Sequence, residues 1–335
     1  MKITVIGAGA IGGLVAGYLK LNGSDVTLAA RKESVGRINQ EGLIISGVKG
    51  KLNIKIEAHE KLIYQPDLVI LTTKTQDIES AIKDNFDFIK NSLIMTTQNG
   101  VETDNIVADY IPEDNIISSI VMFGATCLYS GKIVHNFEGS WIIGKLGTKA
   151  DKDIDDIKKT INDAFNVVIS DDIKAMKYLK IFVNANNCIA AILGISMQEA
   201  FRNIDISAIA ISIWKEGLNI VETANVKLVS LPDFPVERVT KLTSIPLRNA
   251  AKTYSQIMSN LSKEPLYGSI LQSIKRNRKS EINYINGEFV RLAKANNLSA
   301  GLNDKLIAMV YEVEDTKRFF TKKELIKETK EFINN

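Results

Sequence analysis

The first residues whose spacing suggests chemistry form a glycine-rich run, Gly7-Ala8-Gly9-Ala10-Ile11-Gly12, directly after the apolar segment Lys2–Ile6. Glycines at this spacing between a strand and a helix permit a tight turn, let a pyrophosphate approach the backbone and let the helix pack on the strand. The unpaired N–H groups at the start of that helix then face the phosphates. A purely structural glycine turn is the alternative, but the flanking strand and helix favour a dinucleotide site at residues 7–12.

Two basic residues, Arg31 and Lys32, follow the second predicted strand, Val26–Ala29. An NAD enzyme usually places an acidic residue at this point, whereas Asp25 stands at the other end of the strand. Arg31 can bind a 2′-phosphate through two charge-assisted hydrogen bonds, and Lys32 can add positive charge. Two solvated cations on a loop are the alternative. The pair favours NADP(H) as the cofactor.

A second group of polar side chains lies on an otherwise apolar helical pattern that runs over residues 173–193. Lys180 and Asn184 are four residues apart, and Asn187 continues the same face at the seventh position. Polar groups on a buried helix need partners, and the oxygen atoms of a ligand would supply them. Alternatively, the two asparagines bond to neighbouring helices while Lys180 reaches water. Spacing alone leaves both interpretations open.

Reduction of a ketone also needs a group that protonates the carbonyl oxygen. The chain has two histidines, of which His59 lies in a charged stretch and His135 in a segment that resembles a hairpin. We expect both to be surface or packing residues, so Lys180 becomes the candidate donor. Further along, Ser280 is predicted to cap a helix, and Gly287 inside that helix pattern indicates close packing against another element.

The elements that must position these residues change character near residue 171. Residues 1–171 alternate Val/Ile-rich strands with helical patterns, which indicates a parallel sheet, and residues 172–335 are mostly helical. Strands are predicted at Lys2–Ile6, Val26–Ala29, Leu68–Thr72, Leu93–Thr97 and Val167–Ser170, helices at Ile11–Leu21 and Asp151–Phe165, and a hairpin extension from Ser130 to Gly147. The fold class is an α/β N-terminal Rossmann-type dinucleotide-binding domain followed by an all-α C-terminal domain.

Composition narrows the class of protein further. The 335 residues carry 42 Lys and Arg against 39 Asp and Glu, and a net charge of +3 gives no reason to expect nucleic-acid binding. Cys127 and Cys188 stand far apart and form no metal or disulfide pattern, so no metal site is expected. Apolar stretches are too short for a membrane span, and we expect a cytoplasmic protein. Amphipathic stretches such as Ile204–Ile220 fit either the core or the surface of a homodimer.

Taken together, these segments resemble the ketopantoate reductase (2-dehydropantoate 2-reductase) family over nearly the whole chain. The resemblance rests on the run from Lys2 to Gly13, on Arg31, Thr73-Lys74, Gln98-Asn99-Gly100, the Lys180 helix, Ser269, the run from Glu281 to Gly287, and Gly301-Leu302-Asn303. It implies NADPH-dependent reduction of 2-dehydropantoate to (R)-pantoate, a step toward pantothenate and coenzyme A. It also implies an active site in a cleft between the two domains.

The resemblance further implies a role for each matched position. Lys180 matches the catalytic lysine that donates the proton, and Glu281 matches an acid that orients this lysine and the hydroxyl group near the nicotinamide ribose. Lys74 and Ala125 match cofactor contacts, and Asn99 matches a residue between cofactor and substrate, although Asn-Gly is also a plain turn signal. Asn184 and Ser269 match substrate-binding positions, with Ser269 near the carboxylate.

Two positions depart from the family pattern. Where many members carry a second asparagine, eight residues after the catalytic lysine, this chain has Cys188, and Asn187 stands one residue early. Gln198 is the nearest polar residue to a further expected asparagine. These departures keep open a reductase or dehydrogenase for another branched or aromatic 2-oxo acid. A non-catalytic NADP-sensing protein on the same scaffold is a further alternative, which the retention of Lys180, Asn184, Ser269 and Glu281 disfavours.

Overall fold

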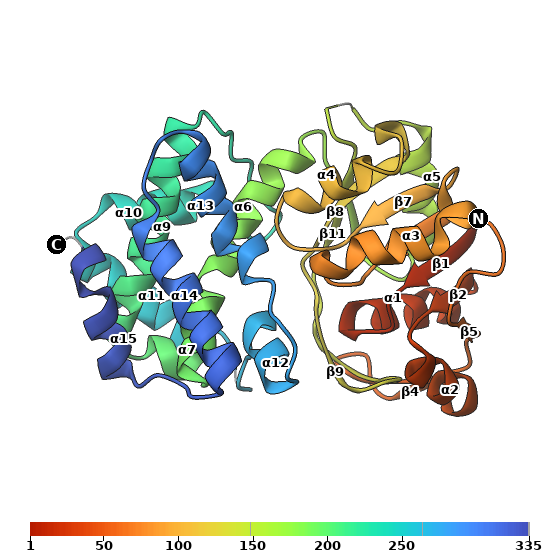
Figure 1. Cartoon of the computed structure of the whole chain (residues 1–335), viewed down its shortest axis with the longest axis horizontal. Helices are drawn as coiled ribbons and strands as arrows, with labels where there is room; N and C mark the ends of the chain where they lie inside the picture. Colours follow the sequence, from red (N-terminus) through yellow and green to blue (C-terminus); the bar gives the residue numbers. More distant parts are fainter. Residues whose placement is uncertain (148, 263, 334–335) are drawn as a thin grey trace. The chain divides into compact units, whose positions relative to one another are not determined.

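The computed structural model describes residues 1–147, 149–262 and 264–333. The chain divides into two compact units, Met1–Lys174 and Ala175–Asn335, and each is described by itself below. Strands and helices alternate in the first unit, and helices dominate the second (Figure 1).

The first unit is built on a large, mostly parallel sheet whose strand order is β12-β11-β8-β7-β6-β1-β2-β5. Its elements are β1 (Lys2–Ile6), α1 (Ala10–Leu21), β2 (Asp25–Ala29), α2 (Lys32–Glu41), β3 (Leu43–Gly47), β4 (Leu52–Ile54), β5 (Ala58–His59), β6 (Leu68–Leu71), η1 (Thr75–Asp77), α3 (Ile78–Ile89), β7 (Leu93–Thr96), α4 (Glu102–Ala108), η2 (Glu113–Asn115), β8 (Ile116–Val121), β9 (Gly124–Tyr129), β10 (Lys132–Phe137), β11 (Trp141–Gly144), α5 (Lys152–Ile161) and β12 (Val167–Ile169). Of the neighbouring strands, β8 and β11 alone run antiparallel in this sheet.

Alternating residues of the central strands send side chains into two separate cores, one on each face of the sheet. On β6, Leu68 and Ile70 pack with α1 and α5, whereas Val69 and Leu71 pack with α3 and α4. A strand buried on both faces needs an apolar residue at every position, which explains the uninterrupted apolar run of β6. Helices on both faces hold the carboxyl edge of the sheet in place.

A smaller sheet with the order β4-β3-β10-β9 lies beside α1. Strands β9 and β10 form a hairpin that turns at Gly131 with φ +83°, so its first strand lies before the predicted range of Ser130 to Gly147. The predicted extension also splits between the two sheets, because β11 leaves the hairpin and pairs with β8 in the large sheet. The small sheet packs on the helix that follows the glycine run, since a side chain at Gly13 would collide with Ile133 of β10.

The regular elements in the described part of the second unit are all helices, most of them packed around the long helix α9 (Ile204–Thr223). The others are α6 (Ile173–Ala185), which begins two residues before the unit does, α7 (Asn187–Leu193), α8 (Met197–Phe201), α10 (Val236–Ser244), α11 (Leu247–Ser259), α12 (Ser269–Lys275), η3 (Ile282–Tyr284), α13 (Asn286–Ala295), α14 (Gly301–Thr316), α15 (Lys322–Thr329) and η4 (Lys330–Phe332). Within the described residues, no helix is both long and apolar enough to cross a bilayer.

Candidate active site

The glycine run forms a tight turn between β1 and α1. Gly7 has φ +108°, and its N–H donates to the carbonyl oxygen of Ala29 at 2.8 Å. This hydrogen bond attaches the turn to the end of β2. A Cβ atom on Gly12 would lie 1.9 Å from the carbonyl oxygen of Gly7, whereas one on Gly9 would meet nothing within 4 Å. Gly12 therefore lets the helix close onto the turn, and Gly9 leaves open space in front of it.

Two threonines after β6 complete this turn, and sequence reasoning gave neither a role in it. The hydroxyl of Thr72 donates to the carbonyl oxygens of Ile6 and Gly7, at 2.9 and 2.8 Å. The hydroxyl of Thr73 is buried and has no hydrogen-bond partner among the described residues. A buried hydroxyl without a partner is costly, so this atom is suited to a polar ligand.

The turn fits the phosphates of a dinucleotide on three observations. Gly9 stands at the N-cap of α1 and has no side chain to cover the N–H groups that follow. Space is open in front of Gly9, and the Thr73 hydroxyl lacks a partner beside the turn. Ala8, Ala10 and Ile11 are half-buried, which leaves backbone of the turn accessible.

The other predicted cofactor residues of the first unit lie on neighbouring strand ends. Arg31 follows β2, Lys74 follows β6 and Asn99 follows β7. Strands β2 and β6 lie on either side of β1, and β7 lies next to β6. Because the strands are parallel, their carboxyl ends share the edge at which the glycine turn lies. Ala125 lies instead on β9 and packs, with Ala8 and Ile11, against the core around α1.

Gln98 holds two of these strand ends together. Its amide nitrogen donates to the carbonyl oxygens of Leu71 and Thr73, at 3.0 and 2.8 Å, and its oxygen accepts from the N–H of Thr97 at 2.9 Å. The side chain is buried, so these bonds tie the loop carrying Asn99 to the loop carrying Lys74. The sequence predicted no structural role for Gln98 beyond its place in the Gln-Asn-Gly run.

Arg31 stands at the N-cap of α2, with 77% of its side chain exposed. Its guanidinium lies 3.4 Å from a carboxylate oxygen of Asp77, which belongs to η1 after β6. Lys32, the next residue, is also exposed. An exposed pair at this distance is a weak attachment, so Arg31 can turn toward an anion at the edge of the sheet.

In the second unit, Lys180 lies on α6 between the buried side chains of Leu179 and Ile181. The lysine is itself half-buried, and this burial lowers its pKa to about 8. Asn184 is half-buried one turn further along the same helix. A lysine that reached freely into water would keep an ordinary pKa, so burial disfavours the interpretation that Lys180 merely extends into solvent.

The predicted helix over residues 173–193 is broken at Asn186, and Asn187 is the first residue of the next helix, α7. At the break, the N–H of Ile189 bonds to the carbonyl oxygen of Asn186 at 3.2 Å. The carbonyl oxygen of Ala185 accepts instead from the side-chain amide of Asn286, also at 3.2 Å. The Asn286 amide thus occupies the Ala185 carbonyl oxygen, to which the N–H of Ile189 would donate in a continuous helix.

Ser269 and Glu281 both stand at the start of short helices in this unit. Ser269 is the exposed first residue of α12, and Glu281 is half-buried before η3. Ser280 accepts from the N–H of Ile282 at 3.4 Å, so the turn that it caps is only η3. The expected close packing at Gly287 is wrong, because a Cβ there would find its nearest neighbour at 3.6 Å.

Neither histidine offers a proton donor. His135 is buried among aromatic rings, its Nδ1 lies 2.9 Å from the hydroxyl of Tyr18, and burial lowers its pKa. His59 pairs with the carboxylate of Glu57 at 2.8 Å. Both are packing or surface residues, as predicted.

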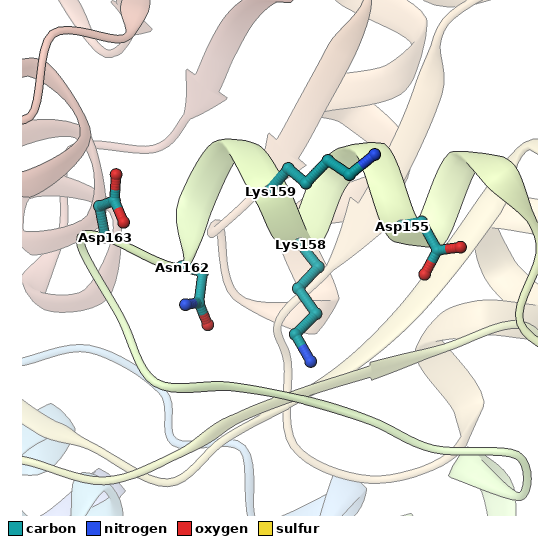
Figure 2. Close-up of a pocket in the computed structure, with 5 residues that line it drawn as sticks. All are labelled: Asp155, Lys158, Lys159, Asn162 and Asp163. Carbon is teal, nitrogen blue, oxygen red and sulfur yellow. The ribbon is translucent and has the colours of Figure 1, made fainter.

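A shallow hollow on α5 is the other feature that could suggest a site. It is lined by Asp155, Lys158, Lys159, Asn162 and Asp163, and Figure 2 shows the two lysines pointing to different sides of the helix. These side chains are exposed or half-buried. None of the predicted site residues is among them, so the hollow is an ordinary solvated surface.

Comparison with known proteins places these features in a family. Residues 3–148 match the family described as ketopantoate reductase PanE/ApbA, and residues 172–314 match its C-terminal counterpart. A 2-dehydropantoate 2-reductase of Pyrococcus horikoshii is 31% identical over 315 residues, which span 92% of this chain and 96% of the relative. The chain belongs to the ketopantoate reductase family. A relative of the same name from Aquifex aeolicus is 25% identical over 322 residues, with 92% and 96% of the two chains covered.

Solved structures confirm the fold. A D-mandelate dehydrogenase determined with NADH and anilino(oxo)acetate has a TM-score of 0.79 and 24% identity, over 94% of this chain and 99% of the other. A PanE/ApbA family ketopantoate reductase from Ralstonia eutropha JMP134 also has a TM-score of 0.79, with 23% identity over 95% and 99% of the two chains. The predicted α/β unit followed by a helical unit is therefore correct.

As a ketopantoate reductase family member, the protein is a dinucleotide-dependent oxidoreductase that acts on CH–OH donors.

The two departures from the family pattern have different consequences in this structure. Cys188 is fully buried in α7, with its sulfur 3.8 Å from the side-chain amide of Asn286. Gln198 is also buried and bonds to the backbone of Ser262, Glu264 and Leu266, at 3.1, 2.8 and 3.0 Å. Gln198 therefore holds the loop before Ser269.

Proposed function

We propose that this protein reduces 2-dehydropantoate to (R)-pantoate with NADPH, and that Lys180 donates the proton. The observation that carries the proposal is Lys180 itself, half-buried on α6 with a pKa of about 8 and with Asn184 one turn away. A lysine whose pKa lies this close to neutrality is a strong enough acid to serve as a proton donor. Membership of the ketopantoate reductase family supports the substrate class.

In the proposed reaction the bound cofactor supplies a hydride to the keto carbon. As the C=O bond opens, the ammonium group of Lys180 stabilises the negative charge that grows on the oxygen and then transfers a proton to it. The products are the alcohol and a neutral lysine, which regains its proton from water. Partial burial strengthens this charge stabilisation, since fewer water molecules compete with the ammonium group.

The remaining residues take supporting roles in the proposal. Glu281 orients Lys180 and the hydroxyl group, Asn184 and Ser269 bind the substrate, and Asn99 lies between substrate and cofactor. Residues 7–12, Lys74 and Ala125 bind the cofactor. The edge of the sheet supports this division, because the glycine turn, Lys74 and Asn99 all follow its parallel strands.

The preference for NADP(H) over NAD(H) rests on Arg31 and Lys32. Both are exposed beyond the end of β2, next to the strand that leads into the glycine turn. A guanidinium can bind a 2′-phosphate through two parallel hydrogen bonds, which the ribose of NAD(H) cannot match. Cys127 and Cys188 form no disulfide within the described residues, in keeping with the reducing cytoplasm that we propose as the location.

A second candidate, reduction of another branched or aromatic 2-oxo acid, follows from Cys188. Cys188 is buried and has no amide group, whereas many family members have an asparagine at this position. We therefore expect the hydrogen bonding to a polar group of the substrate to differ. The chemistry at the keto carbon is the same for both candidates, and only substrate recognition differs.

The test is a substrate panel with the purified protein. Loss of NADPH absorbance is followed with 2-dehydropantoate, 2-oxoisovalerate, pyruvate and benzoylformate, and NADH is compared with NADPH for the best acid. The proposal requires the highest kcat/KM for 2-dehydropantoate with NADPH. A higher value for benzoylformate or 2-oxoisovalerate would move the assignment to the second candidate, and turnover of none of them would overturn both.

A further inference from the structure

The side chain of Asn187 lies against the backbone that leads into Ser269. Helices α7 and α12 pack on each other, and Gly268 stands at the N-cap of α12. A Cβ atom built on Gly268 would lie 3.0 Å from both Cβ and Cγ of Asn187 and 3.3 Å from its Oδ1. The absence of a side chain at Gly268 therefore lets the Asn187 side chain pack against the residue that precedes Ser269.

Neither of these two side chains has a hydrogen-bond partner within the described residues. The hydroxyl of Ser269 is on an exposed residue, and Asn187 is half-buried. A polar amide that is partly withdrawn from water loses free energy unless a partner replaces the water. The Asn187 amide lies against the residue that precedes Ser269, and neither its N–H nor the Ser269 hydroxyl is used within the part of the protein that the structure describes.

Cys188 cannot share this role, because it points into the core of the unit. It is 0% exposed, and its sulfur contacts the Asn286 amide at 3.8 Å. Burial raises the pKa of this thiol to about 12, so it stays neutral and unreactive. Consecutive helical residues point about 100° apart, so Asn187 faces α12 where Cys188 does not.

Two further contacts keep Asn187 and Ser269 in register. Gln198 fixes the chain before Tyr267 through three hydrogen bonds to the backbone of Ser262, Glu264 and Leu266. The side-chain amide of Asn286 donates to the carbonyl oxygen of Ala185, just before α7 begins. The loop and the helix that carry the two groups are both anchored by buried amides.

We propose that Asn187, together with Ser269, binds the carboxylate of the 2-oxo acid, and so replaces the asparagine that this chain lacks at position 188. The inference rests on the proposed function for its ligand class. A carboxylate accepts hydrogen bonds from both an amide N–H and a hydroxyl, and such charge-assisted bonds are stronger than neutral ones. Because every 2-oxo acid has this carboxylate, Asn187 contributes equally to all of them.

The test compares Asn187→Ala and Asn187→Asp with Asn219→Asp, an exposed position on α9 that adds the same charge. We expect Asn187→Ala to raise KM for the 2-oxo acids about 10-fold or more, since a hydrogen bond to a charged group is lost. Asn187→Asp should raise it further, because two carboxylates then repel each other. NADPH affinity and the thermal midpoint should match the wild type in all three variants.

Three results would overturn the inference. Asn187→Asp with wild-type KM would remove Asn187 from the substrate. Losses confined to 2-dehydropantoate, which alone in the panel carries a hydroxyl group, would assign Asn187 to that hydroxyl instead of the carboxylate. An equal loss in Asn219→Asp would make the effect one of net charge.

The inference and the proposed function can fail separately. If 2-dehydropantoate is a poor substrate, the same variants are compared with whichever 2-oxo acid is reduced best. If none is reduced, calorimetry measures pantoate binding to the NADP⁺-loaded protein. Binding by the wild type that is lost in Asn187→Asp would uphold the inference without the reaction, and absence of binding by the wild type would overturn both.

Discussion

At the scale of single residues, burial gives Lys180 its chemical character. An ordinary lysine has a pKa of 10.5, and desolvation on α6 lowers that of Lys180 to about 8. The ammonium form therefore dominates at neutral pH, yet it releases its proton far more readily than a solvated lysine does. A histidine is not needed, and the two that the chain has are occupied by Glu57 and by the aromatic core.

The lowered pKa of Lys180 predicts the pH dependence of the reaction. Reduction needs the protonated lysine, which exists below the folded-state pKa of about 8. We expect kcat/KM for reduction to be level on the acidic side of this value and to fall above it, by about tenfold per pH unit. The reverse oxidation should rise toward the same pH. A reduction rate that stays constant well above pH 8 would show that another group supplies the proton.

Arg31 allows a second prediction at this scale. Replacing Arg31 by Ala removes the guanidinium that we assign to the 2′-phosphate, so the Kd for NADPH should rise about 10- to 100-fold. The Kd for NADH should change little, because NADH has no 2′-phosphate. Fluorescence titration measures both, with Arg248→Ala, an exposed arginine on α11, as the control. Equal losses for the two cofactors would contradict the assignment.

The sequence predicted the features that depend on local spacing, and it missed the contacts that depend on distant residues. The glycine turn is local, and its geometry followed from the spacing of Gly7, Gly9 and Gly12. Thr72 and Gln98 act through carbonyl groups 25 to 66 positions away, which no local pattern records. Their one signal was a polar side chain directly after a buried strand.

At the scale of elements, the glycines of the turn before α1 have separable duties. Gly12 is required by packing, because a side chain there would overlap the carbonyl group of Gly7. Gly9 is not required by packing, because the space in front of it is open and its φ of −77° suits any residue. We therefore assign Gly9 to the approach of the cofactor phosphates.

This separation predicts different outcomes for two substitutions. Gly12→Ala should lower the thermal midpoint and weaken NADPH binding together. Gly9→Ala should weaken NADPH binding while the midpoint stays at the wild-type value. Gly36→Ala is the control, since it lies on α2 with open space around it and should stabilise the protein by about 0.5–1 kcal/mol. Unchanged NADPH affinity in Gly9→Ala would contradict the assignment of the cofactor phosphates to this turn.

Most predicted elements were found within one or two residues of their expected ends, because strands buried on both faces leave clear apolar runs. Strands β1, β6 and β7 are examples. The short strands β3, β4 and β5 were missed, since they are mixed in polarity and gain order from their neighbours. The break between α6 and α7 could not be predicted either, because the amide that causes it belongs to Asn286.

At the scale of the whole molecule, the residues to which we assign roles lie in both compact units. The first unit carries the glycine turn and Arg31, and the second carries Lys180, Asn184, Ser269 and Glu281. Length and composition predicted two globular domains, and the enzyme class was predicted from the motifs and the family resemblance. The directions of side chains such as Asn187 and Cys188 depend on the packing of the helical unit, which the sequence alone does not reveal.

The central claim is that Lys180 donates the proton, and a comparison of Lys180→Ala with the wild type tests it most directly. The measurement is the initial rate of NADPH-dependent reduction of the best 2-oxo acid, together with the Kd for NADPH. Lys174→Ala, an exposed lysine on the same helix, is the control. We predict that Lys180→Ala loses roughly 10²- to 10⁴-fold in rate while its NADPH affinity stays at the wild-type value. A Lys180→Ala enzyme that retains the wild-type rate, or that loses rate only in proportion to NADPH binding, would contradict the mechanism.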